Sequence, residues 1–420
     1  MESLASAARA YPLLHPRRPP SSASSSSDTA TIKAIFRTMS EQQEFDLLSN
    51  PFELRYGRRY LRELPYPLPC DLAEIQRQNL RTLLTTTVFG KPLCNPRWET
   101  EPPRRVLEMG CGGGYWSGVA HDWFLERGHR NVEFVGLDIA PIASDLKATG
   151  VNWRFVHQDM RRLPLPFEDD YFDLVMMKDI TLTMPLDRTS DKVLEDVVRI
   201  LAPGGAIELW DSDNVIRSLA PGAPPAPSRK PEEQEIAERT ATYAIAPGHA
   251  FVPTRNKHLE KANAWIAEAL DRRKLNPTPC ARVGEGIVME PNLEGIGMRR
   301  VAVPFGELRW EQTAARHSRP DSNGHDSPMS TGSGEKASRA QKVLTSDQLA
   351  LRQTALMTVL QQIESFEPMM REVSKKNAEE WSLWRANMLA ELMDPKTALT
   401  GECLELGAWW ATKKQPCDEI

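Results

Sequence analysis

The chain has 420 residues, and its 52 Lys and Arg against 57 Asp and Glu give a formal net charge of −5. This acidic balance argues against a general nucleic-acid binder, because phosphate binding depends on clustered Lys and Arg. The sequence has no run of about 18 apolar residues and no C-x-x-C pair among its six cysteines, so it predicts neither a membrane-spanning helix nor a structural zinc site.

The first 45 residues are predicted to be a disordered tail. Between Ser21 and Ser27 all positions but one are serine, and Pro19 and Pro20 precede them. Such a segment cannot bury enough apolar surface to offset its ordering entropy. The tail is also poor in acidic residues, so a mitochondrial transit peptide stays open as an alternative. Residues 46–99 follow as a helical leader, with a helix expected over 71–84.

Between Arg104 and Asp213, short apolar runs alternate with stretches of helical periodicity. This alternation predicts a parallel sheet with helices on both faces. The predicted strands are 105–109, 132–137, 152–156, 172–177 and 206–210, the predicted helices are 115–127 and 191–201, and a tight turn is expected at 203–205.

The second half of the chain is expected to complete this core, which spans 100–310 and 343–420. A proline-rich linker over 219–228 and a disordered insertion over 311–342 interrupt it, since the insertion has no Ile, Leu, Val or aromatic residue. The expected helices are 256–275, 346–366 and 368–393, and the expected late strands are 296–305 and 402–411.

A glycine cluster from Glu108 to Gly114 follows the first predicted strand and opens a helix. Open α/β sheets bind ligands at this edge, and glycine lets a ligand approach the backbone closely. A dinucleotide fingerprint fails in both registers, because its third glycine falls on Tyr115 or Ser117. No Gly-Lys-Ser/Thr ending follows either, so the cluster is not a P-loop.

The glycine cluster, an acidic residue followed by glycines at alternate positions, resembles motif I of class I S-adenosylmethionine-dependent methyltransferases. Further matching features follow in order: Asp138 after the second strand, Asp159 after the third, the fourth strand 172–177 and the turn 201–205. The resemblance covers about residues 104–213. It implies a Rossmann-like, seven-stranded, mostly parallel sheet with helices on both faces, a helical leader and added C-terminal helices. It also implies S-adenosylmethionine as cofactor.

The resemblance implies a set of cofactor-binding residues. Glu108 and Gly110 would line the methionine end, and Gly112 and Gly114 would let the backbone pass beside the cofactor. The remaining positions are Asp138 on the ribose, Ile139 on the adenine ring, Asp159 with the Met160 backbone on the adenine edge, and Lys178 beside the acceptor. Lys178 and Asp179 are expected to form a structural salt bridge on the acceptor side, and the alternative is that either acts there as a base or polar anchor.

The leader carries a second resemblance. The run Tyr56-Gly-Arg-Arg-Tyr60, Tyr66-Pro-Leu-Pro69, Asp71, Glu74 and Arg77 is similar to the leader of fungal methyltransferases of the velvet-complex regulator type, many of which serve secondary metabolism. It implies that the leader helix covers the cofactor, with Arg58 as partner of the cofactor carboxylate. The glycine loop departs from that type, which usually carries a threonine where Cys111 stands here.

The expected function is methyl transfer to a small-molecule acceptor such as a secondary metabolite. Transfer from a sulfonium depends mainly on alignment, and a general base is needed only where the acceptor carries a proton, so no catalytic residue is assigned. The alternative is a regulatory protein that binds the cofactor and acts through a protein partner. Nucleic-acid methylation is disfavoured, because no Asn/Asp-Pro-Pro-Tyr/Phe signature follows the fourth strand. A reducing, cytoplasmic location is expected, with the nucleus as alternative.

Overall fold

The computed structural model describes residues 51–62, 66–220, 230–246, 249, 251–308, 311, 344–394 and 401–415. The expected tail over 1–45 lies outside these ranges, as do most of the proline-rich linker and all of the expected insertion except Glu311.

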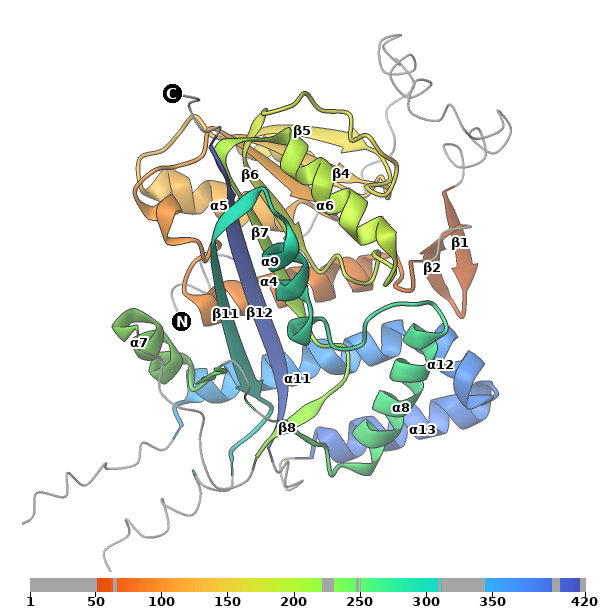
Figure 1. Ribbon diagram of the computed structural model, residues 1–420. Helices are drawn as coiled ribbons and strands as arrows, with labels where there is room; N and C mark the ends of the chain where they lie inside the picture. The colour runs from red at the N-terminus through yellow and green to blue at the C-terminus, as the bar shows by residue number, and fades with distance from the viewer. Residues whose placement is uncertain are drawn as a thin grey trace, which may run out of the picture. The chain divides into compact units, whose positions relative to one another are not determined.

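A mixed sheet forms the centre of the fold (Figure 1). Parallel strands follow one another in the order β5-β4-β3-β6-β7, and β12 and then β11 continue the sheet in antiparallel pairing. These strands confirm the expected Rossmann-like sheet, which three short strands enlarge to ten. The strands are β3 (Arg105–Met109), β4 (Glu133–Asp138), β5 (Asn152–His157), β6 (Phe172–Lys178), β7 (Leu201–Ser212), β8 (Arg217–Leu219), β9 (Tyr243–Ala244), β10 (Phe251–Pro253), β11 (Leu293–Pro304) and β12 (Glu402–Lys413).

Helices cover both faces of the sheet because its strands are apolar on both sides. Val106 and Leu174 pack into a core with α4, α5 and α11, whereas the next residues along the strands, Leu107 and Val175, pack against α6 and α9. The helices are α4 (Leu72–Phe89), α5 (Tyr115–Glu126), α6 (Arg188–Ile200), α7 (Pro231–Thr240), α8 (Lys257–Asp271), α9 (Val283–Met289), α11 (Ser346–Ser365), α12 (Glu367–Ser374) and α13 (Ala378–Leu392), with 3-10 turns η1 (Pro96–Glu99), η2 (Leu146–Thr149) and η3 (Pro279–Ala281).

The leader begins with a hairpin rather than a helix. Strands β1 (Phe52–Arg55) and β2 (Arg58–Leu61) are joined by Tyr56 and Gly57, whose φ angles of 51° and 75° are those of a two-residue hairpin turn. Helix α4 then starts at Asp71, whose side chain accepts a hydrogen bond from the Glu74 N–H at 3.1 Å. The helix runs past its predicted end and stops at Gly90, with φ 80°.

Two predictions in the sheet and the late helices change in detail. The turn expected at 203–205 is an irregularity inside β7, where pairing with β6 jumps from Leu201 to Ala206. The helix expected over 368–393 is two helices, because Lys375 adopts φ 56° and Asn377 caps a new helix.

Glu311 is ordered, although it was predicted to open the disordered insertion. Its carboxylate accepts hydrogen bonds from both terminal nitrogens of Arg352 at 2.8 Å and from the Tyr243 hydroxyl at 2.6 Å. Arg352 is only 1% exposed, so a charged partner is needed there.

Candidate active site

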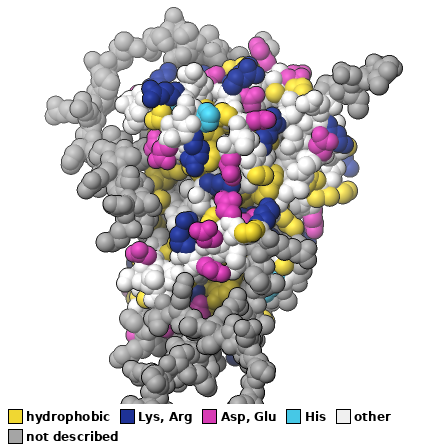
Figure 2. All heavy atoms as spheres, turned by 90° about the vertical axis from the view of Figure 1, so that its left-hand side faces the viewer, with side chains coloured by type: hydrophobic (Ala, Val, Ile, Leu, Met, Phe, Trp, Pro, Cys, Tyr) yellow, Lys and Arg dark blue, Asp and Glu magenta, His cyan; other side chains and the backbone are white. Residues whose placement is uncertain are grey.

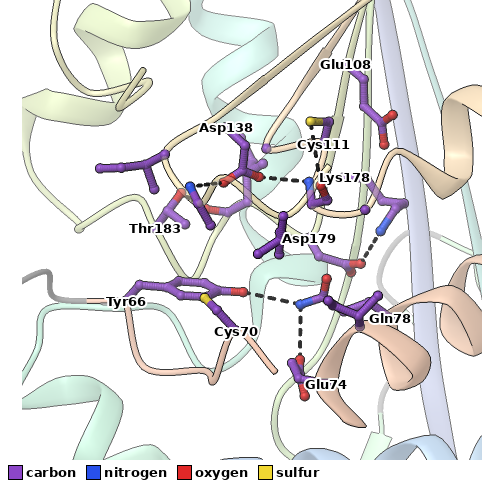
Figure 3. Close-up of a pocket in the computed structure, with 18 of the residues that line it drawn as sticks. Tyr66, Cys70, Glu74, Gln78, Glu108, Cys111, Asp138, Lys178, Asp179 and Thr183 are labelled. Atoms are coloured by element: carbon purple, nitrogen blue, oxygen red, sulfur yellow. Dashed lines mark hydrogen bonds and ion pairs between the residues drawn. The ribbon is translucent and has the colours of Figure 1, made fainter. Parts of the chain in front are cut away.

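A cavity of about 1020 Å³ lies between helix α4 and the carboxyl ends of β3, β4 and β6 (Figure 3). Every cofactor residue expected within the core, apart from Gly114, lines it. These residues are Glu108, Gly110, Gly112, Asp138, Ile139, Asp159, Met160 and Lys178. The topology thus brings together side chains from four different strand ends.

The glycine turn after β3 needs glycine for two reasons. Gly110 and Gly112 have φ angles of 68° and 51°, which L side chains rarely adopt. A Cβ on Gly110 would also lie 3.1 Å from Met160 Cε, and one on Gly112 would lie 3.3 Å from Gln78 Oε1. Gly114 caps α5 with φ 76°, and a Cβ there would meet Leu146 at 3.2 Å, so its requirement comes from backbone conformation and core packing rather than from the cavity.

Asp138 lies at the end of β4, on the same sheet edge as the glycine turn. Its Oδ2 accepts a hydrogen bond from the Gly112 N–H and its Oδ1 accepts one from the Ala140 N–H, both at 2.8 Å (Figure 3). Burial raises the pKa of Asp138, while the two backbone N–H groups oppose that rise. The carboxylate is therefore oriented toward the cavity before any ligand binds.

Glu108 is a buried carboxyl at the end of β3. Its Oε2 accepts hydrogen bonds from the Ser117 hydroxyl at 2.6 Å and from the Ser117 N–H at 3.2 Å. Burial raises the pKa of Glu108 to about 7, although Ser117 and the charge of Lys178 oppose the rise. At neutral pH this group can therefore donate or accept a proton.

The residues expected at the adenine edge lie together after β4 and β5. Asp159 forms an ion pair with Arg161 at 2.8 Å, and Arg161 also lines the cavity. The Ile139 carbonyl accepts a hydrogen bond from His157 Nε2 at 2.7 Å, which fixes the chain where Ile139 enters the cavity. An adenine amino group at Asp159 would share this carboxylate with Arg161.

Lys178 ends β6, Asp179 follows it, and the two residues form the expected salt bridge. Lys178 Nζ donates to Asp179 Oδ2 at 2.8 Å (Figure 3). Burial would raise the pKa of Asp179, but the charge and hydrogen bond of Lys178, together with the nearby charges of Arg81 and Arg77, outweigh burial and lower it. Asp179 also has φ 54°, a conformation that non-glycine residues adopt mainly where the surrounding structure imposes it.

Arg58 lies apart from the cavity. Its guanidinium holds Asp71, with Nε to Oδ2 at 2.5 Å and a terminal nitrogen to Oδ1 at 2.8 Å. Arg58 is absent from the lining of the cavity and instead ties the hairpin to the start of α4. This placement gives no support to its predicted contact with the cofactor carboxylate.

The leader contributes cavity residues that the sequence analysis did not single out. Tyr66, Cys70 and Gln78 line the cavity, and Gln78 Nε2 donates to Glu74 Oε1 at 3.1 Å (Figure 3). The spacing of Glu74, Gln78 and Thr82 at every fourth position of one helix could have indicated a common polar face.

Two further features bear on the possible chemistry. Within the described ranges, no three His, Cys, Asp or Glu side chains gather in a way that could bind a metal ion. The same residues include no helix that is long and apolar enough to cross a membrane. On the face shown in Figure 2, basic and acidic side chains are interspersed.

Residues 106–205 match a family profile described as a methyltransferase domain. Among solved structures, the chain is similar to a protein of Pyrococcus horikoshii, at 25% identity over 37% of this chain and 65% of that one, with a TM-score of 0.27. It is also similar to the N-methyltransferase NodS of Bradyrhizobium japonicum, solved with S-adenosyl-L-homocysteine, at 16% identity over 34% of this chain and 64% of that one, with a TM-score of 0.24.

A third similar structure is phosphoethanolamine N-methyltransferase 2 of Haemonchus contortus, with S-adenosylhomocysteine bound. It is 11% identical over 83% of this chain and 62% of that one, with a TM-score of 0.33. The chain thus spans less than two thirds of the length of each of these relatives. A search among curated proteins found no match.

Proposed function

We propose that this chain, whose residues 106–205 form an S-adenosylmethionine-dependent methyltransferase domain, transfers a methyl group in line to a small-molecule acceptor. The observation that carries the proposal is the meeting of Asp138 with the glycine turn in one cavity. The Asp138 carboxylate accepts from the Gly112 N–H at 2.8 Å and lies on the cavity wall.

The residues of the cavity fit this cofactor. Left-handed glycines leave the backbone open at Gly110 and Gly112, and Asp138 offers two carboxylate oxygens to the ribose hydroxyls. We assign the adenine ring to Ile139 and its polar edge to Asp159 with the Met160 backbone. Glu108 lies where the amino-acid end would be held.

When bound, S-adenosylmethionine supplies a methyl group activated by its own sulfonium charge. The chain's contribution is alignment, which can lower a barrier by about 7–11 kcal/mol without a nucleophilic side chain. Helix α4 and Tyr66 form the side of the cavity that faces the sheet edge. An acceptor must fit beneath α4, which favours a small metabolite, such as a secondary metabolite, over a protein or nucleic-acid strand.

Calorimetry with S-adenosylhomocysteine tests the cofactor assignment. Wild-type protein should bind it with micromolar affinity, and Asp138→Ala should weaken binding at least 100-fold, because both ribose contacts are lost. Asp145→Ala is the matched control, since Asp145 is an exposed carboxylate beyond the end of the same strand and caps η2. Equal affinity of Asp138→Ala and wild type would overturn the assignment of Asp138 to the ribose.

A velvet-type regulatory protein that acts through partners is the second candidate. One observation favours it: Leu54 and Leu72 of the leader are 78% and 66% exposed, so a partner could contact both. In cells lacking the protein, Asp138→Ala should fail to restore the metabolite profile if methyl transfer is the function. Full restoration by Asp138→Ala, together with failure of Leu54→Ser/Leu72→Ser, would favour the regulatory role.

A further inference from the structure

A smaller side pocket of about 210 Å³ adjoins the cofactor cavity. Thr82, Lys178 and Asp179 line both spaces, so the two share a wall. Arg81 and Asp211 line only the side pocket. None of the roles proposed above uses either residue.

Arg81 is a buried cation that the carboxylates of Asp179, Glu74 and Asp211 attract only from beyond ion-pair distance. Arg81 is 2% exposed. Within the described ranges it forms no ion pair with an N···O distance of 4 Å or less. Its guanidinium donates to neutral groups: Nε to Thr358 Oγ1 at 3.1 Å, one terminal nitrogen to Ser212 Oγ at 2.8 Å and the other to Gln362 Oε1 at 3.1 Å. A guanidinium has five N–H groups, so one N–H on each terminal nitrogen remains for a ligand.

The other charged groups near the pocket are paired with each other. Lys178 binds Asp179 at 2.8 Å, and one turn from Arg81 along α4 Arg77 binds Glu74 at 2.7 Å. Burial, together with the neighbouring charge of Arg77, lowers the pKa of Arg81 to about 10. An isolated buried cation of this kind is costly unless an anion compensates it.

Asp211 is the remaining charged group of the pocket. Its Oδ2 accepts hydrogen bonds from the Thr181 hydroxyl at 2.7 Å and from the Thr181 N–H at 3.2 Å, and Oδ1 accepts one from the Ser212 N–H at 2.8 Å. Burial and the charge of Asp179 raise the pKa of Asp211 to about 7. Below that pH Asp211 is neutral, and the side pocket then holds two cations, Lys178 and Arg81, against one carboxylate, Asp179.

The charged and titratable groups around Asp211 come from three places. Lys178 ends β6 and Asp179 follows it, α4 contributes Arg81, and η3 contributes Cys280, whose Sγ donates to the Asp211 carbonyl at 3.6 Å. Burial raises the pKa of the Cys280 thiol, so this group is neutral. Strand β12 contributes the uncharged Leu406 to the pocket. On α11, the residues that contact Arg81 are the uncharged Thr358 and Gln362.

We propose that the side pocket binds a carboxylate of the methyl acceptor, with the two remaining N–H groups of Arg81 as a bidentate anchor. The inference rests on the proposed methyl transfer and names the class of its substrate. A guanidinium edge matches the geometry of a carboxylate, and neutral Asp211 donates its proton as a further hydrogen bond. A cationic acceptor group would be repelled by Arg81. The carboxylate that could attract it, Asp179, already pairs with Lys178. The pocket holds the carboxylate while the rest of the acceptor extends past Thr82 into the cofactor cavity.

Calorimetry with benzoate on protein saturated with S-adenosylhomocysteine tests the inference, and benzamide serves as the neutral analogue. Benzoate should bind at least tenfold more tightly than benzamide at pH 6. Benzoate binding should weaken about tenfold from pH 6 to pH 8, because Asp211 loses its proton and then repels the ligand. Equal binding of the two compounds, binding of neither, or pH-independent binding of benzoate would overturn the inference.

Two variants separate the residues. Asp211→Asn keeps the shape of the side chain and should abolish the pH dependence of benzoate binding. Asp213→Asn is the matched control, because Asp213 is another buried carboxyl just after β7 whose pKa is raised to about 7, yet it lies outside both cavities. Its variant should keep the pH dependence of the wild type.

Arg81→Gln should weaken benzoate binding at least tenfold and leave the affinity for S-adenosylhomocysteine within twofold of wild type. If this variant does not fold, Arg81→Lys and Asp211→Asn test the side pocket in its place. Arg81→Lys keeps the positive charge but loses the paired N–H groups of the guanidinium. It should therefore weaken benzoate binding less than Arg81→Gln does. Wild-type protein that binds S-adenosylhomocysteine but not benzoate refutes the side pocket alone. Wild-type protein that binds neither refutes the proposed function itself.

Discussion

The two walls of the cofactor cavity are built in different ways. On the sheet wall, Glu108, the glycine turn and Asp138 follow the ends of adjacent parallel strands, so local chain geometry and strand order place them. On the helical wall, α4 is held by α11, almost 300 residues further along: Ser365 donates to Glu74 Oε2 at 2.7 Å, with a sequence separation of 291. The sheet wall is therefore a local motif, whereas the helical wall exists only once distant segments have packed together.

In the proposed reaction, the sheet wall would bind the cofactor and the helical wall would select the acceptor. The sheet wall uses backbone N–H groups and carboxylates, which are defined by short spacings. The helical wall uses buried ionic and polar contacts between α4, β7 and α11, centred on Arg77 and Arg81. Acceptor specificity can therefore change through α11 without disturbing the cofactor residues.

Breaking the ion pair of the helical wall should have the largest effect on stability. Arg77 binds Glu74 at 2.7 Å, with side chains 6% and 1% exposed. Glu74→Ala leaves a buried cation unpaired and should lower the free energy of unfolding by about 3–5 kcal/mol. Glu101→Ala is the control, since the exposed Arg97–Glu101 pair should contribute under about 1 kcal/mol. Denaturant titration measures both, and equal losses would contradict the importance of the long-range wall.

The sheet wall should give the protein a pH-dependent stability. The pKa of Glu108 is about 7 in the fold against 4.5 for an ordinary glutamate, so the folded state binds more protons between these values. The proton on Glu108 therefore stabilises the fold, and this stabilisation is complete below about pH 4.5. It is lost as the pH rises to about 7, which lowers the free energy of unfolding by up to about 3 kcal/mol. Glu108→Gln should be more stable than wild type at pH 8 and similar to it at pH 4.5. A wild-type-like pH profile in this variant, measured by denaturation at both pH values, would argue against a buried proton on Glu108.

A substitution in the glycine turn should lower the stability of the protein by less than the changes above. Gly112→Ala places a Cβ at φ 51° and should cost about 1–3 kcal/mol of unfolding free energy. Gly128→Ala also places a Cβ on a left-handed residue, at φ 86°, with no atom within 4 Å of the new Cβ. Both variants should lose similar stability, but only Gly112→Ala should lose affinity for S-adenosylhomocysteine in calorimetry. Equal affinities would mean that the cofactor does not pass close to Gly112.

Much of the sheet wall could be predicted from the sequence. The Rossmann-like fold is confirmed, and the family match supports the enzyme class and its cofactor. The likeness of the leader to velvet-type regulators and the individual binding roles stay predictions. Local patterns were sufficient for the fold because strand alternation and the glycine spacing act over a few residues.

The helical wall could not be predicted in the same way. Arg58 and Arg81 are both leader arginines in one sequence, yet Arg58 pairs with Asp71 whereas Arg81 reaches Ser212, Thr358 and Gln362. No spacing distinguishes the two, because the partners of Arg81 come from β7 and α11. The sequence did not predict the hairpin β1–β2, because its turn needs a left-handed residue at Tyr56. Tyrosine rarely adopts that conformation, so the residue type gives no indication of it.

The position of β12 between β7 and β11 has a consequence for how the protein is made. Until β12 docks, residues 206–212 of β7 present an unpaired, apolar strand edge that is open to pairing with other chains. Pairing between strands so far apart in the sequence forms slowly. The newly made chain therefore passes through a partly folded, aggregation-prone intermediate before β12 pairs with β7. Truncation ahead of Glu402 should therefore produce insoluble protein in expression trials rather than a smaller working enzyme.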